Sequence, residues 1–257
     1  MSQSRELETF LLHVKGAVTR FEKNAVPACI GFADEAIKDE CIEYFRKSGF
    51  CDYTFITTSQ DCQRQFLVVG DTYVCDGEIV YLRACPDKFH TPSHKDYMGA
   101  IMNLGLERKM FGDIIVTDEN NAFFTVWNKG DVLPFLYENF TSCGRAKIKL
   151  EQVSSKDFEL LELQYVETDV VTTSLRADCI VSAITGMSRS QSKEFISDGG
   201  LKLNSRPVSD VDRVFLQGDV FSLKRYGKYR FDSFLGQSRR DRMRIRLLKY
   251  GNYIERK

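Results

Sequence analysis

Apolar side chains in the first part of the chain recur at the spacing of amphipathic helices. Between Arg5 and Lys23 they return every three or four residues, which predicts an opening helix. A second helical pattern follows Asp34 and ends at Gly49. Short β-branched or aromatic runs come next, at residues 53–57, 66–69 and 79–82. The pattern predicts an α+β segment.

The stretch from Cys85 to Pro92 interrupts these patterns and holds two of the five prolines, so it is the best candidate for a linker. After it, a helical pattern ends near Gly105, and two strands surround a polar turn at residues 118–121. A helix is expected at residues 132–140, followed by a half-buried strand that starts at Ala146. This order predicts a second small α+β unit.

The residues after 174 read as two short helices followed by short strands. The first helical stripe, which starts at Leu175, stops at Gly186. Ser188 to Gln191 then match a capping box, in which the serine oxygen accepts an amide hydrogen bond and the glutamine reaches back. The second helix ends at Gly199-Gly200. Short strands or extended segments are expected at residues 201–203, 207–208, 214–216 and 220–223, with turns at 204–205 and 218–219.

Charge divides the chain into two unequal parts. Residues 1–169 carry 18 Lys and Arg against 27 Asp and Glu, a net charge of −9, whereas residues 170–257 carry 18 against 9, a net charge of +9. A basic module on an acidic body is the asymmetry expected when one part meets a polyanion. A basic face that merely docks on the acidic half is the alternative.

The remaining composition is that of an ordinary globular protein, with 43% hydrophobic and 28% charged residues. No apolar run has the roughly 18 to 20 residues of a membrane-spanning helix, so we expect a cytoplasmic protein without membrane contact. None of the eight cysteines forms a Cys-x-x-Cys pair, which excludes a zinc ribbon. Cys85, His90 and His94 could be weighed as metal ligands, but their loop setting disfavours it, and we expect no cofactor.

The order of elements in residues 174–231 resembles the S4 RNA-binding domain. Leu175 to Asp178 is similar to the opening element of that family, residues 188–193 to the start of its second helix, and residues 201–204 to its small strand. Gly218-Asp219-Val220 resembles the closing turn. Ser205 stands where the family usually has a turn glycine.

Upstream, residues 94–106 (HKDYMGAIMNLGL) and 112–116 (GDIIV) resemble the YlmH family of S4-containing proteins. The resemblance covers residues 94–250 and implies three domains. These are a small N-terminal α+β domain (1–84), a middle domain similar to the ferredoxin-like RNA-recognition motif (85–168), and an S4 domain with a basic C-terminal strand (169–257). It further implies association with the large ribosomal subunit, contact with rRNA and tRNA in translation or the rescue of stalled chains, and a link to cell division.

The predicted RNA-binding residues share a cationic or polar side chain at the helix starts, the β-turn and the basic strand. A helix that begins at Ser188 points free amides and the positive end of its dipole at a phosphate. In the last basic run, alternation puts Arg242, Arg244 and Arg246 on one face of a strand. The full set is Arg176, Ser188, Arg189, Ser190, Gln191, Lys193, Lys202, Asn204, Arg206, Lys224, Arg225, Lys228, Arg242, Arg244 and Arg246. For Arg176 an ion pair with Asp178 is the alternative, and for the basic strand a merely solvated face.

Catalytic signatures are absent from the sequence. We find no phosphate-binding loop with Lys-Ser/Thr, no nucleophile elbow and no dinucleotide fingerprint. The aspartate motif of S4-bearing pseudouridine synthases occurs only as the S4-like Leu175 to Asp178. The sequence therefore predicts a non-enzymatic, monomeric RNA-binding protein. An RNA-modifying enzyme of the pseudouridine synthase type and a protein-recruitment scaffold are the alternatives.

Overall fold

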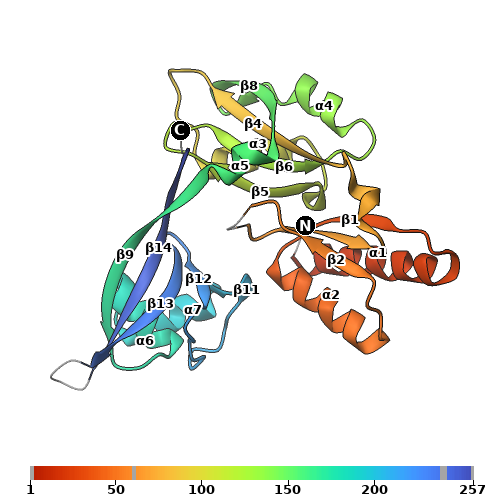
Figure 1. Cartoon of the computed structure of the whole chain (residues 1–257). Helices are drawn as coiled ribbons and strands as arrows, with labels where there is room; N and C mark the ends of the chain where they lie inside the picture. Colours follow the sequence, from red (N-terminus) through yellow and green to blue (C-terminus); the bar gives the residue numbers. More distant parts are fainter. Residues whose placement is uncertain (1–2, 60–61, 238–241, 256–257) are drawn as a thin grey trace. The chain divides into compact units, whose positions relative to one another are not determined.

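The computed structural model describes residues 3–59, 62–237 and 242–255. The chain divides into two compact units, Met1–Glu162 with Tyr253–Lys257, and Leu163–Asn252. Together they contain three antiparallel sheets in a mixed α+β architecture (Figure 1). Among the described residues, no helix is both long and apolar enough to cross a membrane.

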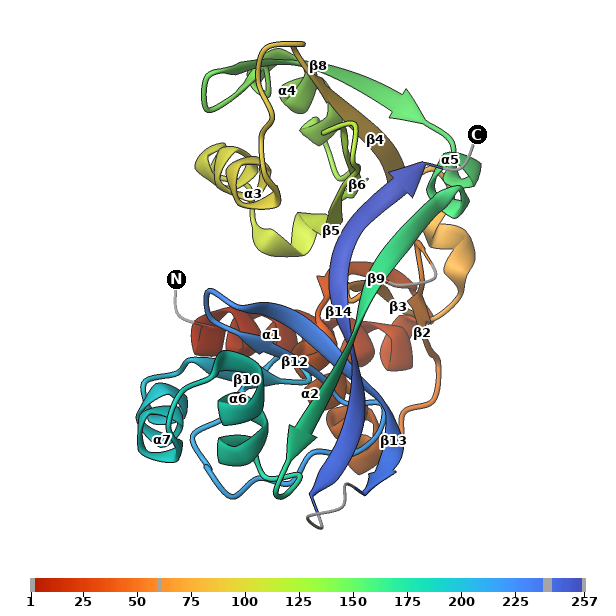
Figure 2. The ribbon, with the colours of Figure 1, turned by 90° about the vertical axis from the view of Figure 1, so that its left-hand side faces the viewer.

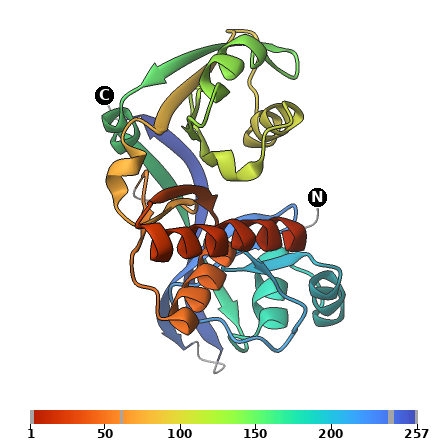
Figure 3. The ribbon, with the colours of Figure 1, turned by 90° about the vertical axis from the view of Figure 1, so that its right-hand side faces the viewer.

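The first sheet of unit 1 has the order β1-β3-β2, with β1 at Ala28–Ala33, β2 at Tyr53–Ile56 and β3 at Gln65–Val69. Helices α1 (Gln3–Asn24) and α2 (Glu35–Ser48) pack on one face of it (Figure 3). Both helices were predicted, and α2 has the expected caps: Asp34 accepts a hydrogen bond from the Ile37 amide, and Gly49 ends the helix. The short helix η1 (Thr72–Cys75) follows β3.

Strand β1 was missed by the sequence analysis. Its ladder with β3 is interrupted between Cys29 and Gly31, where an irregular register masks the alternation of a strand. Gly31 has a φ of 125°, and a Cβ atom there would lie 2.7 Å from the Lys109 carbonyl oxygen. The site therefore requires glycine both for its backbone conformation and for the close approach of a neighbouring segment.

The second sheet of unit 1 has the order β5-β6-β4-β8-β7, and every pair in it is antiparallel. Helices α3 and α4 pack on one face through Tyr97, Ile101 and Leu136 (Figure 2). The short helix α5 covers the other face through Phe158. The elements are β4 (Ile79–Pro86), α3 (His94–Asn103), η2 (Arg108–Met110), β5 (Phe111–Val116), β6 (Ala122–Trp127), α4 (Val132–Asn139), β7 (Ser142–Cys143), β8 (Ala146–Val153) and α5 (Ser155–Glu159).

The linker expected at Cys85–Pro92 begins later than predicted. Cys85 pairs with Lys149 and Pro86 with Ile148, so β4 continues past residue 84. The prediction of a loop was wrong for these two residues. They pair with β8, a strand more than 60 residues later in the sequence, and the proline was the only signal that the prediction used. The division between residues 84 and 85 thus falls within a strand.

Unit 2 contains a six-stranded sheet of order β11-β10-β12-β13-β14-β9, together with two helices. Helices α6 and α7 share one core with the strands, built around Ile180, Ile196 and Phe221. The elements are β9 (Leu161–Thr172), α6 (Ala177–Thr185), α7 (Arg189–Ser197), β10 (Leu201–Leu203), β11 (Arg206–Pro207), β12 (Val220–Leu223), β13 (Gly227–Gln237) and β14 (Met243–Glu255).

Most short elements of unit 2 were predicted, but its two long strands β9 and β13 were not. Residues 214–216, expected to be extended, form only an isolated bridge between Val214 and Arg176. The predicted turn between β10 and β11 is present. Asn204 and Ser205 both have positive φ angles, 48° and 63°, so this two-residue hairpin turn forms without the usual glycine.

Candidate RNA interface

The corner between α6 and α7 sets the position of the predicted phosphate site. Gly186 ends α6 in the left-handed conformation, and the Ser182 hydroxyl donates to the Met187 carbonyl. Ser188 and Gln191 form the predicted capping box: the Gln191 amide donates to Ser188 Oγ, and the Ser188 amide donates to Gln191 Oε1. The capping prediction is confirmed. These two side chains are used by the helix itself.

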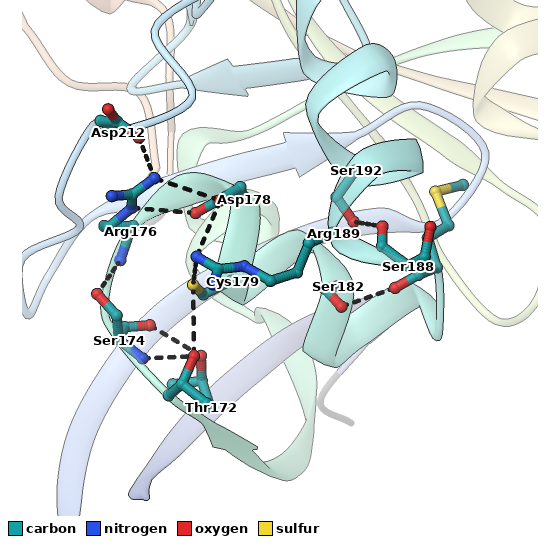
Figure 4. Close-up of polar contacts among 12 residues, drawn as sticks. Thr172, Ser174, Arg176, Asp178, Cys179, Ser182, Ser188, Arg189, Ser192 and Asp212 are labelled. Carbon is teal, nitrogen blue, oxygen red and sulfur yellow. Dashed lines mark hydrogen bonds and ion pairs between the residues drawn. The ribbon is translucent and has the colours of Figure 1, made fainter.

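Two arginines meet one buried carboxylate beside this corner (Figure 4). Asp178 is fully buried, and its Oδ1 and Oδ2 accept hydrogen bonds from Arg176 at 3.2 and 3.4 Å. Arg189 Nη2 lies 3.2 Å from Asp178 Oδ2, and Asp212 pairs with Arg176 from the outer side. The ion pair that the sequence left open for Arg176 is therefore formed, and Arg189 takes part in the same cluster.

The charge state of Asp178 follows from these contacts. Burial by itself would raise the pKa of this carboxyl. The hydrogen bond from Arg176 and the charges of Arg176 and Arg189 outweigh burial and hold the pKa below its ordinary value. The side chain of Arg189 nevertheless keeps 59% of its surface exposed, so it can contact a ligand while it remains paired.

The basic run in β14 alternates as predicted, and one of its arginines is already paired. Ile245 and Leu247 are buried, whereas Arg244 is exposed. Arg246 donates to Asp169 at 2.8 and 3.2 Å and pairs with Glu167 at 2.9 Å. An RNA contact at Arg246 stays a prediction, and it would compete with these acids of the neighbouring strand β9.

The remaining residues of this run lie at its start. Arg242 is exposed and lies one residue before β14, so the strand begins inside the predicted run. Arg239 and Arg240 lie outside the described residues.

The Asn204 side chain forms hydrogen bonds within the domain. Its Nδ2 donates to Asp219 Oδ1 at 2.9 Å, and its Oδ1 accepts from the Val220 amide at 2.9 Å. Asp219 in turn accepts from the Leu216 amide at 2.8 Å. Because these bonds occupy both ends of the amide, Asn204 holds the β10–β11 turn against β12 and does not serve as a free RNA contact.

Four of the predicted cations surround one shallow depression. Lys202 of β10, Lys224 and Arg225 at the β12–β13 turn, and Lys228 of β13 line a hollow of about 710 Å³. Lys228 Nζ also lies 4.7 Å from the ring centroid of Tyr250. Within the described part of the chain, no carboxylate pairs with Lys202, Lys224 or Arg225. The hollow is therefore a positively charged surface that can receive a phosphate-bearing ligand.

Three other predicted contacts are exposed but do not line this hollow. Ser190 and Lys193 are exposed on α7, and Arg206 is exposed on β11. Arg230 of β13 was not among the predicted RNA-binding residues. Its guanidinium carbon lies 5.0 Å from the ring centroid of Tyr165. The alternation of Lys228 and Arg230 in the sequence was the signal for it.

Comparison with known proteins agrees with the sequence resemblance. Residues 78–157 match the family model described as "Putative RNA-binding domain in YlmH". The "Ribosome-associated protein quality control protein P2" of Bacillus subtilis (strain 168) is 26% identical over 159 residues, which are 62% of this chain and 61% of that protein. Residues 78–157 are thus similar to the RNA-binding domain of YlmH proteins. The aligned part spans less than two thirds of the B. subtilis protein.

A solved structure, "Cell division protein ylmH from Streptococcus pneumoniae", is also similar, with 21% identity and a TM-score of 0.46. The similarity covers 62% of this chain and 96% of that one.

Cys85, His90 and His94, which the sequence offered as possible metal ligands, do not form a metal site. Among the described residues, no group of three or more His, Cys, Asp or Glu side chains could hold a metal ion. His90 Nδ1 lies 2.7 Å from Asp87 Oδ1, and Cys85 lies in β4.

Proposed function

We propose that unit 2 is an S4-type RNA-binding domain with which the protein binds rRNA and tRNA on the large ribosomal subunit. The observation that carries this proposal is the positively charged hollow of Lys202, Lys224, Arg225 and Lys228. Phosphate contacts supply most of the affinity of such surfaces, and the net charge of +9 in residues 170–257 favours them. The similarity to the ribosome-associated protein quality control protein P2 of B. subtilis supports a role in ribosome-associated quality control.

The order of elements supports the domain assignments. Two short helices joined by a tight corner, followed by a hairpin with a two-residue turn, are the features on which the S4 resemblance rests. In the middle part, β4-α3-β5-β6-α4-β8 follow the βαββαβ order of ferredoxin-like folds, with β4 between β6 and β8. We therefore propose the same three domains, an N-terminal domain, a domain similar to the RNA-recognition motif and an S4 domain, with the first boundary moved from residue 84 to the start of β4 at Ile79.

The proposal is for a cytoplasmic, monomeric binding protein and not for an enzyme. In the pseudouridine synthase alternative an aspartate must reach the RNA base. The matching residue here, Asp178, is fully buried and held by two arginines. A carboxylate in that position stabilises the fold and has no access to a substrate.

The test removes the charges of the hollow in the full chain. A variant with Lys202, Lys224 and Arg225 all replaced by Ala should bind ribosomes and tRNA at least tenfold more weakly, because each lost phosphate contact costs affinity. The slope of affinity against salt concentration should fall by about 3.

The control variant replaces Lys23, Lys47 and Lys156 by Ala, which removes the same charge from exposed positions of unit 1. We expect it to bind like the unchanged protein. Equal losses in both variants would mean that net charge, and not this hollow, determines binding. Formation of pseudouridine in RNA incubated with the protein would favour the enzyme alternative.

A further inference from the structure

Phe89 is the large apolar side chain with the most unusual exposure, since 90% of its surface is open to solvent. It lies in the loop between β4 and α3, and the backbone of that loop is held in place. Asp87 Oδ1 accepts from the Phe89 amide at 3.0 Å, and Asp87 Oδ2 accepts from the Lys147 amide at 2.8 Å. Exposing a phenylalanine on a fixed loop has a free-energy cost that burial elsewhere would avoid.

The surroundings of Phe89 are positively charged. The Asp87 amide donates to the Lys147 carbonyl at 3.0 Å, which brings the loop beside the start of β8 (Figure 2). Lys88 in the loop, Lys147 in β8 and Arg145 in the β7–β8 turn are all exposed.

Two acids of this loop and of β8 are already engaged. Asp87 holds the loop through its hydrogen bonds, and Glu151 pairs with Arg83 and Lys149, at 2.7 Å each. Among the residues that the structure describes, no carboxylate pairs with Lys88, Arg145 or Lys147. An aromatic side chain beside such cations matches the chemistry of a single-stranded nucleic acid.

The face of the sheet that could otherwise receive bases is closed. In RNA-recognition motifs, aromatic residues of the two central strands stack on bases. Here the corresponding central strands are β4 and β6. Their aromatic residues Tyr81 and Phe123 pack edge-on against Phe158 of α5, with ring centroids 5.0 and 5.8 Å from that of Phe158. Phe123 is fully buried. Helix α5 therefore covers the sheet surface on which bases stack in that motif. A base that stacks on this domain would need another exposed aromatic side chain.

We propose that Phe89 stacks on an unpaired nucleobase while Lys88, Arg145 and Lys147 contact the phosphates beside it. This inference rests on the proposed RNA-binding function and adds a second contact, in residues 78–157, to that of unit 2. It also assigns a preference: this site takes an unpaired base, whereas the hollow of unit 2 takes phosphates of any RNA.

The experiment uses the full chain and two probes, a short oligoadenylate and the same strand annealed to oligouridylate. Base stacking on an aromatic ring contributes roughly tenfold in affinity. Phe89→Ala should therefore weaken binding of the single strand roughly tenfold and leave binding of the duplex unchanged. Phe89→Trp should keep the affinity, and its fluorescence should be quenched by the single strand, since the native Trp127 is buried.

The matched control is Tyr73→Ala, which removes another aromatic side chain of unit 1 that is 62% exposed. It should leave both affinities unchanged. The variant without Lys202, Lys224 and Arg225 should lose binding to both probes, which separates the two proposals. Loss of oligoadenylate binding in that variant together with unchanged binding in Phe89→Ala would overturn the stacking site and leave the proposed function intact.

Three other outcomes would also overturn the stacking role of Phe89. Equal losses on both probes in Phe89→Ala would mean that the residue acts through the fold, and would overturn the stacking role. A Phe89→Ala protein that binds oligoadenylate normally but no longer sediments with ribosomes would assign the loop to a protein contact and overturn the proposal. If the unchanged protein bound neither probe, both proposals would fail.

Discussion

Arg189 Nη2 lies 3.2 Å from Oδ2 of Asp178, a carboxylate without solvent exposure that Arg176 also holds. Arg189, a cation of the predicted phosphate site, thus forms an ion pair with a buried residue of its own unit. Because 59% of the Arg189 side chain stays exposed, the same residue can contact RNA while the buried acid fixes its orientation. Stability and binding are therefore coupled at this position, and the two must be measured together.

Asp178→Ala should lower the free energy of unfolding by about 2 to 3 kcal/mol, because it removes the buried carboxylate of the cluster together with the hydrogen bonds that it accepts from Arg176 and Arg189. Asp212→Ala is the control, since this acid pairs with the same Arg176 but is 61% exposed. It should cost less than about 1 kcal/mol. Urea unfolding of both variants provides the comparison, and equal losses would show that burial of Asp178 has no special effect.

Ser188→Ala should cost about 1 kcal/mol of stability through the lost N-cap of α7. Ser190→Ala, two residues along the same helix turn, should change stability by less than about 0.5 kcal/mol because this exposed side chain does not cap the helix. Thermal unfolding tests the pair. A loss of RNA affinity in Ser190→Ala at full stability would identify a direct RNA contact at the helix start.

Asn204→Ala should lower stability by about 1 to 2 kcal/mol, since both of its hydrogen bonds are lost and alanine disfavours the positive φ angle. Affinity for RNA should change little. Lys202→Ala, in the same hairpin, should do the reverse and weaken RNA binding without loss of stability. Circular dichroism melting and filter binding on the two variants distinguish a structural residue from a binding residue, and the opposite result would return Asn204 to the interface.

Arg246→Ala should leave RNA affinity within about twofold of the unchanged protein, because its guanidinium is already engaged by Asp169 and Glu167 on β9. The partly exposed ion pairs should contribute less than about 1 kcal/mol to stability. Arg244→Ala, two residues earlier on β14, should weaken RNA binding more. If the Arg246 variant showed the larger loss of affinity, the interface would extend over the β9 acids.

The loop that carries Phe89 should respond to acid at low pH only. Hydrogen bonds from Lys147 and His90 lower the pKa of Asp87 to about 2, below its ordinary value near 3.8. A folded-state pKa below the unfolded value means that the contribution is complete above about pH 4 and is lost as the pH falls toward 2. Nuclear magnetic resonance of the Phe89 amide should show a shift in that range, and a transition above pH 5 would contradict the assignment.

Short-range signals in the sequence were sufficient for most helices and turns. The capping box at Ser188–Gln191, the glycine stops and the alternation in residues 243–247 involve neighbours a few residues apart, so their physical chemistry is local. The charge asymmetry between the two parts of the chain is likewise a property of composition. These features predicted the other α-helices and the turn at Asn204-Ser205, whereas the short helix α5 was not predicted.

Only the tertiary structure decided which predicted cations are available. Arg246 and Asp169 are 77 residues apart in sequence, and their ion pair exists because β14 and β9 are neighbours in one sheet. Strand β1 was not predicted because its pairing with β3 is irregular between Cys29 and Gly31, and the residues with which it pairs are distant in sequence. The exposure of Phe89 and the covering of Phe123 by Phe158 are also long-range results. A side chain's partners depend on which segments pack together, and the spacing of residues along one segment carries no information about that.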